Sequence, residues 1–393
     1  MKRLLALLVL SSLSSSLEAQ LSARQGIIAF THVTVIDVPG GPALSDSTVV
    51  VAGDRIAQVG TSGEVFPPAN AESIDATGKF LIPGLWDMHT HPDEVEYLPQ
   101  FIANGVTGIR VMWGKPYHHE WRKEIESGTL LGPRMLIASN ILDGPKPNWP
   151  GSVAIADASQ ARQAVIRAKE EGADFLKVYS YLPREAYFAI VDEARRQGIP
   201  VEGHVPDSVS AEEASNAGQK SFEHLLGVLP ACSTWANEWD KAALGDLLEQ
   251  NSLEKPAWNA TRTDAIKQRV LDGYSADKAA ALFALLKKNG TWQCPTLTVL
   301  HKTAFINQPS FSDDPRLKYV PRETRAWWYM WTKSKRLWLQ GDNLVYTRKE
   351  FEKELEIVGS MQRAGVGLLA GTGQLNAYCF PGFSLHDELG LLG

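Results

Sequence analysis

The sequence predicts a (β/α)8 barrel that follows a small N-terminal β domain. From Phe80 onward, short apolar runs alternate with stretches of helical periodicity, which is typical of parallel strands joined by right-handed crossovers. The 393 residues are enough for one large barrel and a small second domain. The apolar runs that predict the eight barrel strands lie at 81–88, 108–112, 135–138, 175–178, 201–203, 221–223, 291–297 and 367–370.

The N-terminus has the pattern of a secretory signal peptide. Lys2 and Arg3 form a basic start, residues 4–10 form an apolar run, and Ala19 is a small residue before the expected cleavage site. The apolar run is too short to span a bilayer. We therefore expect residues 1–19 to be removed and the chain to be exported, periplasmic or secreted, without a membrane anchor. An uncleaved anchor is the alternative.

Residues 20–79 predict the N-terminal part of the small β domain. Segments 28–38 and 48–59 are rich in β-branched residues, and Gly-containing turn signals follow or interrupt them. Residues 80–393 predict the barrel, with helical patterns at 159–171 and 184–196 between its strands. A mostly helical insertion is expected at about 232–289, over the strand ends where a barrel carries its active site.

Composition excludes several classes of protein. Hydrophobic residues make up 44% and charged residues 21%, as in ordinary globular proteins. The net charge of -6 argues against a nucleic-acid-binding protein, which would carry a basic surface. The three cysteines, Cys232, Cys294 and Cys379, are odd in number and widely spaced. They predict neither a disulfide framework nor a thiolate zinc site.

Two histidines, His89 and His91, end the first predicted barrel strand. Alternate side chains of a strand point to the same face, so this spacing aims two imidazoles at one point. Imidazole pairs suit a borderline cation such as zinc. The alternative for an isolated pair of this kind is a surface turn, but here the pair follows a buried-looking run.

Three more residues of the ligand type end later predicted strands: Lys177, His204 and His224. A lysine at the end of an apolar strand is costly unless it is neutralised or paired, and a neutral lysine can react with carbon dioxide to form a carbamate that bridges two cations. Taken singly, Lys177 could form an ion pair and each histidine could be a hydrogen-bonded core residue. Because barrel strands end on one face, the five residues together predict a metal centre there.

These residues resemble the amidohydrolase superfamily of metal-dependent hydrolases, and within it the imidazolonepropionase-like and prolidase-like carboxypeptidase branch. The resemblance covers nearly all of the mature chain. The motifs that carry it are Ile-Pro-Gly-Leu-Trp-Asp-Met-His-Thr-His at 82–91, Leu-Gly-Pro-Arg at 131–134, Phe-Leu-Lys-Val-Tyr at 175–179, Gly-His at 203–204, Phe-Glu-His at 222–224 and Pro-Gly-Phe-Ser-Leu-His-Asp-Glu-Leu at 381–389.

The resemblance implies two divalent metal ions, zinc before manganese or iron. His89 and His91 would hold the buried ion, and His204 and His224 would hold the exposed one. Lys177, carboxylated, would bridge the two. A metal-bound hydroxide would then cleave a C–N bond, amide or peptide-like, next to a carboxylate. Tyr179 could orient a substrate oxygen, or it could be an ordinary core residue.

The sequence departs from the family pattern at two places. Family members end strand 8 with Gly-Thr-Asp, whereas this chain has Gly371-Thr372-Gly373. The aspartate would bind the buried metal and transfer the proton, and such assistance is worth roughly 10² to 10⁴ in rate. We therefore expect an impaired enzyme. The chain also ends at Gly393, inside the helix after strand 8, so the C-terminal part of the family fold is expected to be missing.

Two alternatives to an amide hydrolase remain: a catalytically inactive metal-binding pseudoenzyme, and a cyclic amidase or lactonase of the same superfamily. The expected partner is a small-molecule amide or dipeptide-like substrate, with a homo-oligomer possible. Specificity is expected in loops 113–120 and 143–150 and in the insertion after Leu229. Trp149 and the pair at 118–119 are candidate pocket residues, although an exposed histidine pair is more often solvated surface. The aromatic run at 327–331 either packs on the barrel or lines the substrate pocket.

Overall fold

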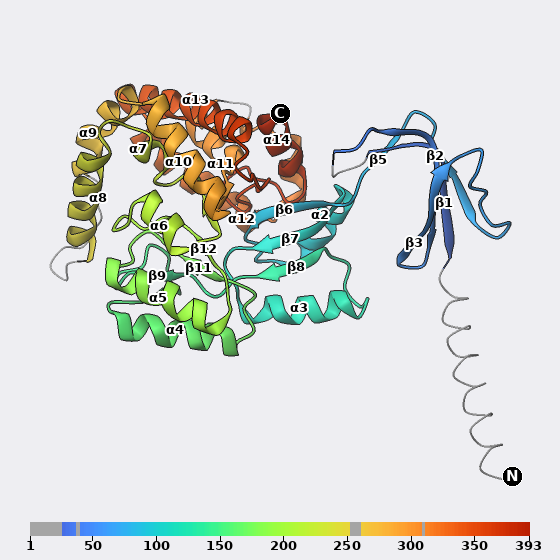
Figure 1. Ribbon diagram of the computed structural model, residues 1–393, viewed down its shortest axis with the longest axis horizontal. Coiled ribbons are helices and arrows are strands. Elements are labelled where there is room, and N and C mark those ends of the chain that lie inside the picture. The colour runs from blue at the N-terminus through green and yellow to red at the C-terminus, as the bar shows by residue number, and fades with distance from the viewer. Residues whose placement is uncertain (1–25, 37–39, 252–260, 309–310) are drawn as a thin grey trace, which may run out of the picture. The chain divides into compact units, whose positions relative to one another are not determined.

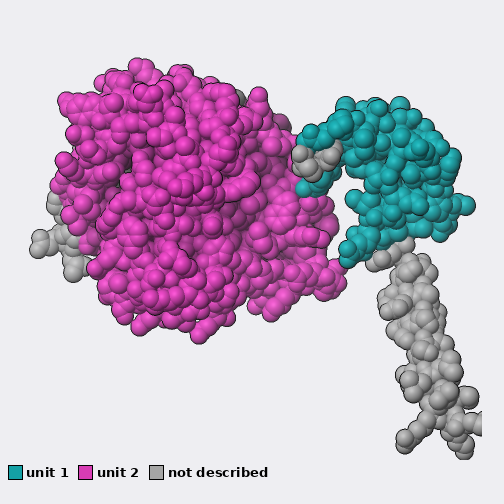
Figure 2. Space-filling view, viewed as in Figure 1, with its two compact units in different colours: residues 1–84 teal, residues 85–393 magenta. Residues whose placement is uncertain are grey.

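The protein divides into two compact units, residues 1–84 and residues 85–393 (Figure 2). This computed structural model describes residues 26–36, 40–251, 261–308 and 311–393. The predicted signal peptide lies outside the described residues. Within the described part, no helix combines the length and the apolar character that crossing a membrane requires.

The first unit is a five-stranded β-sheet in the order β3-β2-β1-β4, with β5 also paired to β1 (Figure 1). β1 and β2 pair antiparallel, as do β2 and β3, whereas β4 and β5 run parallel to β1. The turn at 53–54 folds the predicted run 48–59 into the β2–β3 hairpin. The strands are β1 Ile27–Val35, β2 Leu44–Ala52, β3 Arg55–Thr61, β4 Glu72–Asp75 and β5 Phe80–Leu81.

The second unit is a mixed α/β fold with two parallel sheets, so the predicted α/β class is confirmed. One sheet has the order β6-β7-β8 and the other the order β10-β9-β11-β12-β13-β14. Their strands are β6 Leu85–Thr90, β7 Val106–Val111, β8 Arg134–Ile137, β9 Leu142–Asp143, β10 Val153–Ala154, β11 Leu176–Val178, β12 Val201–Gly203, β13 Ser221–Glu223 and β14 Trp292–Cys294.

Among the described residues, no continuous ladder closes these sheets into a barrel. Single bridges connect them instead. Ala138 pairs with Phe175 directly, and the segment 368–374 pairs with Gln293 at Leu368 and with Thr90 at Gln374. The prediction of a strand at 367–370 is wrong, because this segment forms only the bridge at Leu368. Four glycines lie between 365 and 373, and glycine weakens a strand since it has no side chain to pack.

Helices connect the strands and cover both sides of them, with α3–α5 below and α10–α13 above the strands in Figure 1. Local signals set their ends: the Asp157 side chain accepts from the backbone N–H of Gln160 at the start of α4, and α5 ends at Gly198 with φ +63°. The helices are η1 Val95–Tyr97, α2 Leu98–Ala103, α3 Pro116–Glu126, α4 Ala158–Glu170, α5 Arg184–Gln197, α6 Ala211–Ala217, α7 Val228–Ala231, α8 Ala236–Asn251, α9 Thr261–Asp272, α10 Ala276–Asn289, α11 Leu297–Ala304, η3 Pro315–Tyr319, α12 Arg322–Trp338, α13 Gly341–Ala364 and α14 Phe383–Leu392.

The apolar interior of the second unit surrounds the parallel strands. Strands β7, β11 and β13 are buried almost throughout, as expected for parallel strands covered by helices. The cysteines Cys232, Cys294 and Cys379 are all buried in this unit and form no disulfide. Burial raises the pKa of the Cys232 thiol to about 12. Strands β11 and β13, which carry or precede candidate ligands, are therefore packed on both faces.

Candidate metal centre

The five predicted ligand residues line one cavity of about 850 Å³. His89 lies near the end of β6 and His91 just after it, Lys177 lies in β11, and His204 and His224 directly follow β12 and β13. The ring centroids of His89 and His91 are 5.1 Å apart, and those of His89 and His224 are 4.5 Å apart. The structure therefore brings together residues that span more than a hundred positions of sequence.

Several of these side chains have a buried polar atom without a hydrogen-bond partner among the described residues. They are His89 Nε2, His91 Nδ1, Lys177 Nζ and His204 Nε2. A buried polar atom left without a partner costs about 1–3 kcal/mol, so folded proteins rarely keep even one. A group of four around one cavity is the arrangement expected of atoms that bind a ligand.

The other ring nitrogens of two histidines are already occupied. His204 Nδ1 lies 2.8 Å from the Ser180 hydroxyl, and His224 Nδ1 lies 2.6 Å from the Thr296 hydroxyl. Such contacts fix the ring and direct Nε2 to the opposite side. Burial lowers the pKa of His224 to about 3, so its ring is neutral at ordinary pH. Neutral imidazole is the form that binds metal ions.

His89 is held by a buried network that the sequence analysis missed. Its Nδ1 donates to Glu223 Oε2 at 2.6 Å, and the second carboxylate oxygen accepts from Arg110 at 2.8 Å and from Ser221 at 2.6 Å. All four residues are buried. The available signals were a glutamate directly before His224 and an arginine inside an apolar strand, but neither identifies its partner.

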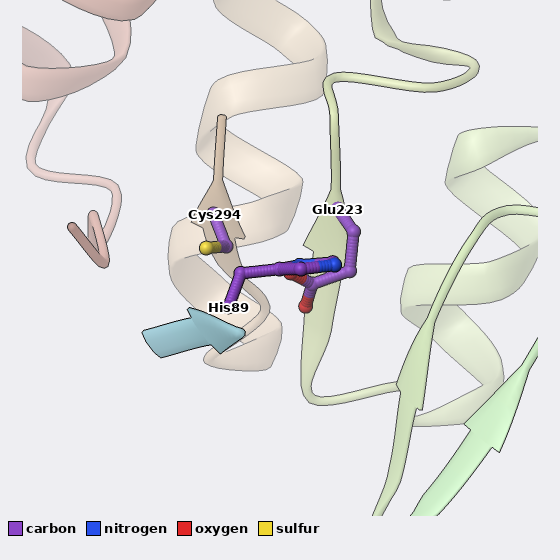
Figure 3. A group of neighbouring side chains, drawn as sticks. All are labelled: His89, Glu223 and Cys294. Carbon is purple, nitrogen blue, oxygen red and sulfur yellow. The ribbon is translucent and has the colours of Figure 1, made fainter. Parts of the chain in front are cut away.

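Figure 3 shows Cys294 beside the His89–Glu223 pair, a group whose ligand atoms lie within 4.8 Å of one another. The group has the composition of a metal site, but its chemistry argues otherwise. Both oxygens of Glu223 already accept hydrogen bonds. Burial raises the pKa of the Cys294 thiol well above its usual range, which keeps it from being the thiolate that binds metal. We therefore assign Glu223 to orienting His89.

Lys177 has no hydrogen-bond partner for its amine among the described residues, so the alternative of a simple ion pair is not found there. Burial is the main cause that lowers its pKa, to about 8. Gly203 makes room for this side chain: a Cβ at that position would lie 3.1 Å from Lys177 Cδ and 2.3 Å from the Val178 carbonyl oxygen. The predicted Gly-His motif thus combines space for the lysine with a candidate ligand, His204.

The last segment before α14, residues 366–374, lies against His89 but offers no ligand-type side chain there. Gly373 donates its backbone N–H to the His89 carbonyl at 2.8 Å and has φ +66°. A Cβ on Gly373 would lie 2.3 Å from Val299 Cγ2. Asp87 accepts from the backbone N–H and the hydroxyl of Thr372 at 2.9 and 2.7 Å. The segment is therefore fixed to β6 by its backbone and by Thr372.

The two nearest following carboxylates serve other purposes. Asp387 pairs with Arg316 at 2.9 Å. Glu388 accepts from the backbone N–H groups of Leu297 and Thr298 at the start of α11, at 2.9 and 2.7 Å. Neither lines the cavity. The position of the expected aspartate is thus not filled by either of them.

Aromatic residues form much of the cavity wall. The ring of Tyr179 stacks on His204 with centroids 3.8 Å apart, and its hydroxyl accepts from Trp149 Nε1 at 2.8 Å. Both residues line the cavity, so Tyr179 is not an ordinary core residue. Both readings of the aromatic run apply: Trp327 lines the cavity, and Trp328 is buried, donating to the Leu375 carbonyl at 3.0 Å.

Of the two alternatives for His118, the structure supports the pocket residue, because the side chain is buried and lines the cavity. Its Nε2 donates to the Pro92 carbonyl at 2.7 Å, and its Nδ1 accepts from the backbone N–H of Lys115 at 3.1 Å. These bonds attach the start of α3 to the segment after β6. No sequence pattern distinguishes such a residue from an exposed histidine.

Known proteins were compared by sequence. An ochratoxinase from Aspergillus niger is 27% identical over 284 residues, which cover 54% of this chain and 58% of that protein. An imidazolonepropionase from Rubrobacter xylanophilus is 47% identical over 51 residues, 12% of each chain. No protein-family model matches. The chain thus spans less than two thirds of the length of the ochratoxinase.

Solved structures give a longer match. A bottromycin amidohydrolase superposes with a TM-score of 0.71 and 26% identity, covering 95% of this chain and 74% of that one. A prolidase-type structure from Bifidobacterium longum gives a TM-score of 0.60 at 21% identity, covering 93% and 78%. With the motifs, the bottromycin amidohydrolase and the sequence matches support an assignment to the amidohydrolase superfamily, and the prolidase-type structure shows the same fold.

Proposed function

We propose that this protein is a metal-dependent hydrolase that cleaves an amide or peptide-like C–N bond. The observation that carries the proposal is the set of unpartnered atoms on His89, His91, Lys177 and His204 around one cavity. The amidohydrolases among the similar proteins support the same reaction class. The substrate is a small amide or dipeptide-like molecule of a size that this cavity can hold.

The donor atoms fit two divalent ions of the zinc type. His89 and His91 would hold one ion, His204 and His224 the other, and a carboxylated Lys177 would bridge them. When bound, such ions lower the pKa of water toward neutrality and polarise a carbonyl oxygen. The lowered pKa of Lys177 supports carboxylation, because the neutral amine is the form that attacks carbon dioxide.

We also propose that the two parallel sheets are parts of a (β/α)8 barrel with an irregular eighth strand. The bridges from Ala138 to Phe175, from Gln293 to Leu368 and from Thr90 to Gln374 support this arrangement. It accounts for the placement of the ligand-type residues, since active sites of such barrels lie at the carboxyl ends of the strands.

Tyr179 is suited to bind a substrate oxygen. Its hydroxyl oxygen accepts from Trp149, which leaves the phenolic proton available to donate into the cavity. Burial raises the pKa of Tyr179 to about 12, so it keeps this proton at ordinary pH. The stack on His204 places the donor next to a candidate ligand.

Turnover is expected to be slow, because Gly373 offers no carboxylate to transfer the proton to the leaving amine. General acid–base groups contribute roughly 10² to 10⁴ in rate. The same observation favours a second candidate function, a metal-binding pseudoenzyme that binds substrate-like molecules without hydrolysing them.

Metal content and amidase activity test the proposal together. Wild type, His204→Ala and His386→Ala would be loaded with zinc, desalted and assayed on N-acyl amino acids and X-Pro dipeptides. His386 is an exposed histidine outside the cavity, so its variant is the matched control. We expect about two ions per wild-type and control chain and fewer in His204→Ala. Chelator-sensitive turnover supports the hydrolase, and metal binding without turnover supports the pseudoenzyme.

Carboxylation has its own readout. Protein equilibrated with ¹³C-bicarbonate and zinc is expected to show a carbamate signal in the ¹³C NMR spectrum. The signal should be absent in Lys177→Met and present in Lys169→Met, which alters a lysine of α4 that does not line the cavity. A wild-type spectrum without the signal would remove the bridging role of Lys177.

A further inference from the structure

A cation lines the cavity in addition to the proposed metal ligands. Lys115 lies directly before α3, and its Nζ is 4.1 Å from the centroid of the Trp113 ring. The carboxylates of Asp93, Glu94 and Glu323 also line the cavity, but among the described residues none comes within the 4.0 Å of an ion pair with Lys115. Among the described residues, Lys115 therefore forms no direct ion pair with any of these carboxylates.

An aromatic wall connects this cation with the candidate metal centre. The rings of Trp113 and Trp149 lie 6.3 Å apart, and Trp149 donates to the hydroxyl of Tyr179, whose ring stacks on His204. Trp113 Nε1 donates to the Asn140 side chain at 2.6 Å. Both indole N–H groups are thus bound within the protein, which fixes the orientation of the rings.

The arrangement has the components of an anion subsite with an apolar floor. A lysine that is half-buried beside an aromatic ring is less hydrated than one in solvent, so a carboxylate gains more by pairing with it. Indole faces provide flat apolar area against which an aromatic or aliphatic group can pack. The wall leads from this subsite to the place where the scissile bond would lie.

We propose that Lys115 binds a carboxylate of the substrate and that Trp113 and Trp149 bind the apolar group beside it. Among the carboxylate-bearing amides that the resemblance already implies, those with an aromatic side chain are then preferred, and Lys115 is the specificity-determining residue. This inference rests on the proposed function for the cleavage itself. The binding preference is independent of turnover and can be measured without it.

The competing explanation is that Lys115 only packs on Trp113. A cation–π contact of this kind stabilises the fold by itself and needs no ligand. In that case Lys115 would influence folding and would not discriminate between a carboxylate and a neutral amide. A direct attraction of the carboxylate to bound metal ions would also leave the preference independent of Lys115.

The test compares the affinities of N-acetyl-L-phenylalanine and N-acetyl-L-phenylalaninamide, which differ in one charge. Binding to the purified protein, with and without zinc, would be measured by calorimetry in wild type, Lys115→Met, Lys115→Arg and Lys123→Met. Lys123 is exposed on α3 and does not line the cavity, so its variant is the matched control. Unfolding midpoints would establish that each variant is folded.

We expect wild type, Lys115→Arg and the control to bind the acid about ten-fold more tightly than the amide, as for a charge-assisted hydrogen bond. Lys115→Met should lose this preference while its affinity for the amide stays within about two-fold. The proposal is overturned if wild type shows no preference, if neither compound binds, or if folded Lys115→Met keeps the preference. If the preference is found but no variant hydrolyses any amide, the proposed function fails and the anion subsite stands.

Discussion

The end of strand β6 and the last segment before α14, residues 366–374, differ in the side chains that they place at the candidate metal centre. At β6, His89 and His91 point polar atoms into it, and Glu223 orients the first of them. At the last segment, the backbone and Thr372 make well-formed hydrogen bonds to β6, but Gly373 has no side chain. The hydrogen bonds that hold a strand end in place are thus made by other groups than the candidate ligands. The hydrogen bonds can therefore be present where the ligand is missing.

The largest loss of stability is expected when the hydrogen-bond network at the end of β6 is disrupted. Glu223→Ala would leave the buried Arg110 with Glu202 as its one remaining carboxylate partner among the described residues, and His89 without its orienting partner. Removing one member of a buried ion pair costs about 3–5 kcal/mol. Urea unfolding should show a loss of this size, against less than about 0.5 kcal/mol for the exposed Glu120→Ala. A loss below about 1 kcal/mol would refute the role of the network.

A smaller loss of stability is expected when a carboxylate is introduced at Gly373, in the last segment. Gly373→Asp should lower the free energy of unfolding by about 2–3 kcal/mol, because the residue would need φ +66° and would crowd Val299. Adding Val299→Ala should recover about half of the loss and permit a gain in zinc content. The control is Gly390→Asp, where a Cβ meets nothing within 4 Å. A single variant as stable as wild type would show that the segment is not rigid.

A third prediction uses Glu388, the carboxylate that supports the start of α11 beside the last segment. Burial raises the pKa of Glu388 from 4.5 to about 7, so the folded state binds the proton more tightly than the unfolded state does. Its contribution to stability is then fully present below pH 4.5 and is lost as the pH rises through about 7.

Urea unfolding between pH 4.5 and pH 7.5 would test this assignment in wild type and Glu388→Gln. Wild type should lose on the order of 2 kcal/mol relative to the variant over this range. Parallel pH profiles of the two proteins would contradict a raised pKa.

The smallest loss of stability is expected when the hydrogen bond from Thr372 to Asp87 is removed, which joins the last segment to β6. Thr372→Val keeps the shape of the side chain but removes the hydroxyl that donates to Asp87. The loss should be about 1 kcal/mol, since the backbone N–H of Thr372 still binds Asp87. Thr372→Ser, which keeps the donor, should be closer to wild type. Equal losses in both variants would assign the effect to packing.

Sequence reasoning located the ligand-type residues because each one ends a short apolar run, and parallel strands end on the same side. It failed at 367–370, where the apolar pattern was present but glycines on either side prevented a regular strand. It also could not pair Arg110 with Glu223, since that contact joins strands far apart in the chain. Periodicity predicts which face a side chain takes, whereas a buried ion pair depends on which strands become neighbours.

The absence of a ligand at Gly373 was visible in the sequence, but its steric consequence was not. The positive φ and the approach of Val299 follow from the packing of α11 against the last segment. Aspartate at position 373 is therefore expected to disturb the packing against Val299, which the sequence alone does not indicate.

The three buried cysteines can report how often the regions around them open. Burial raises the pKa of each thiol, so a reagent that attacks thiolates meets almost no reactive form in the folded state. Labelling then proceeds only through fluctuations that expose the sulfur. Cys294 ends β14, Cys232 directly follows α7, and Cys379 lies before α14. Mass spectrometry of the labelled peptides would therefore record, separately and under native conditions, how often each of these regions opens.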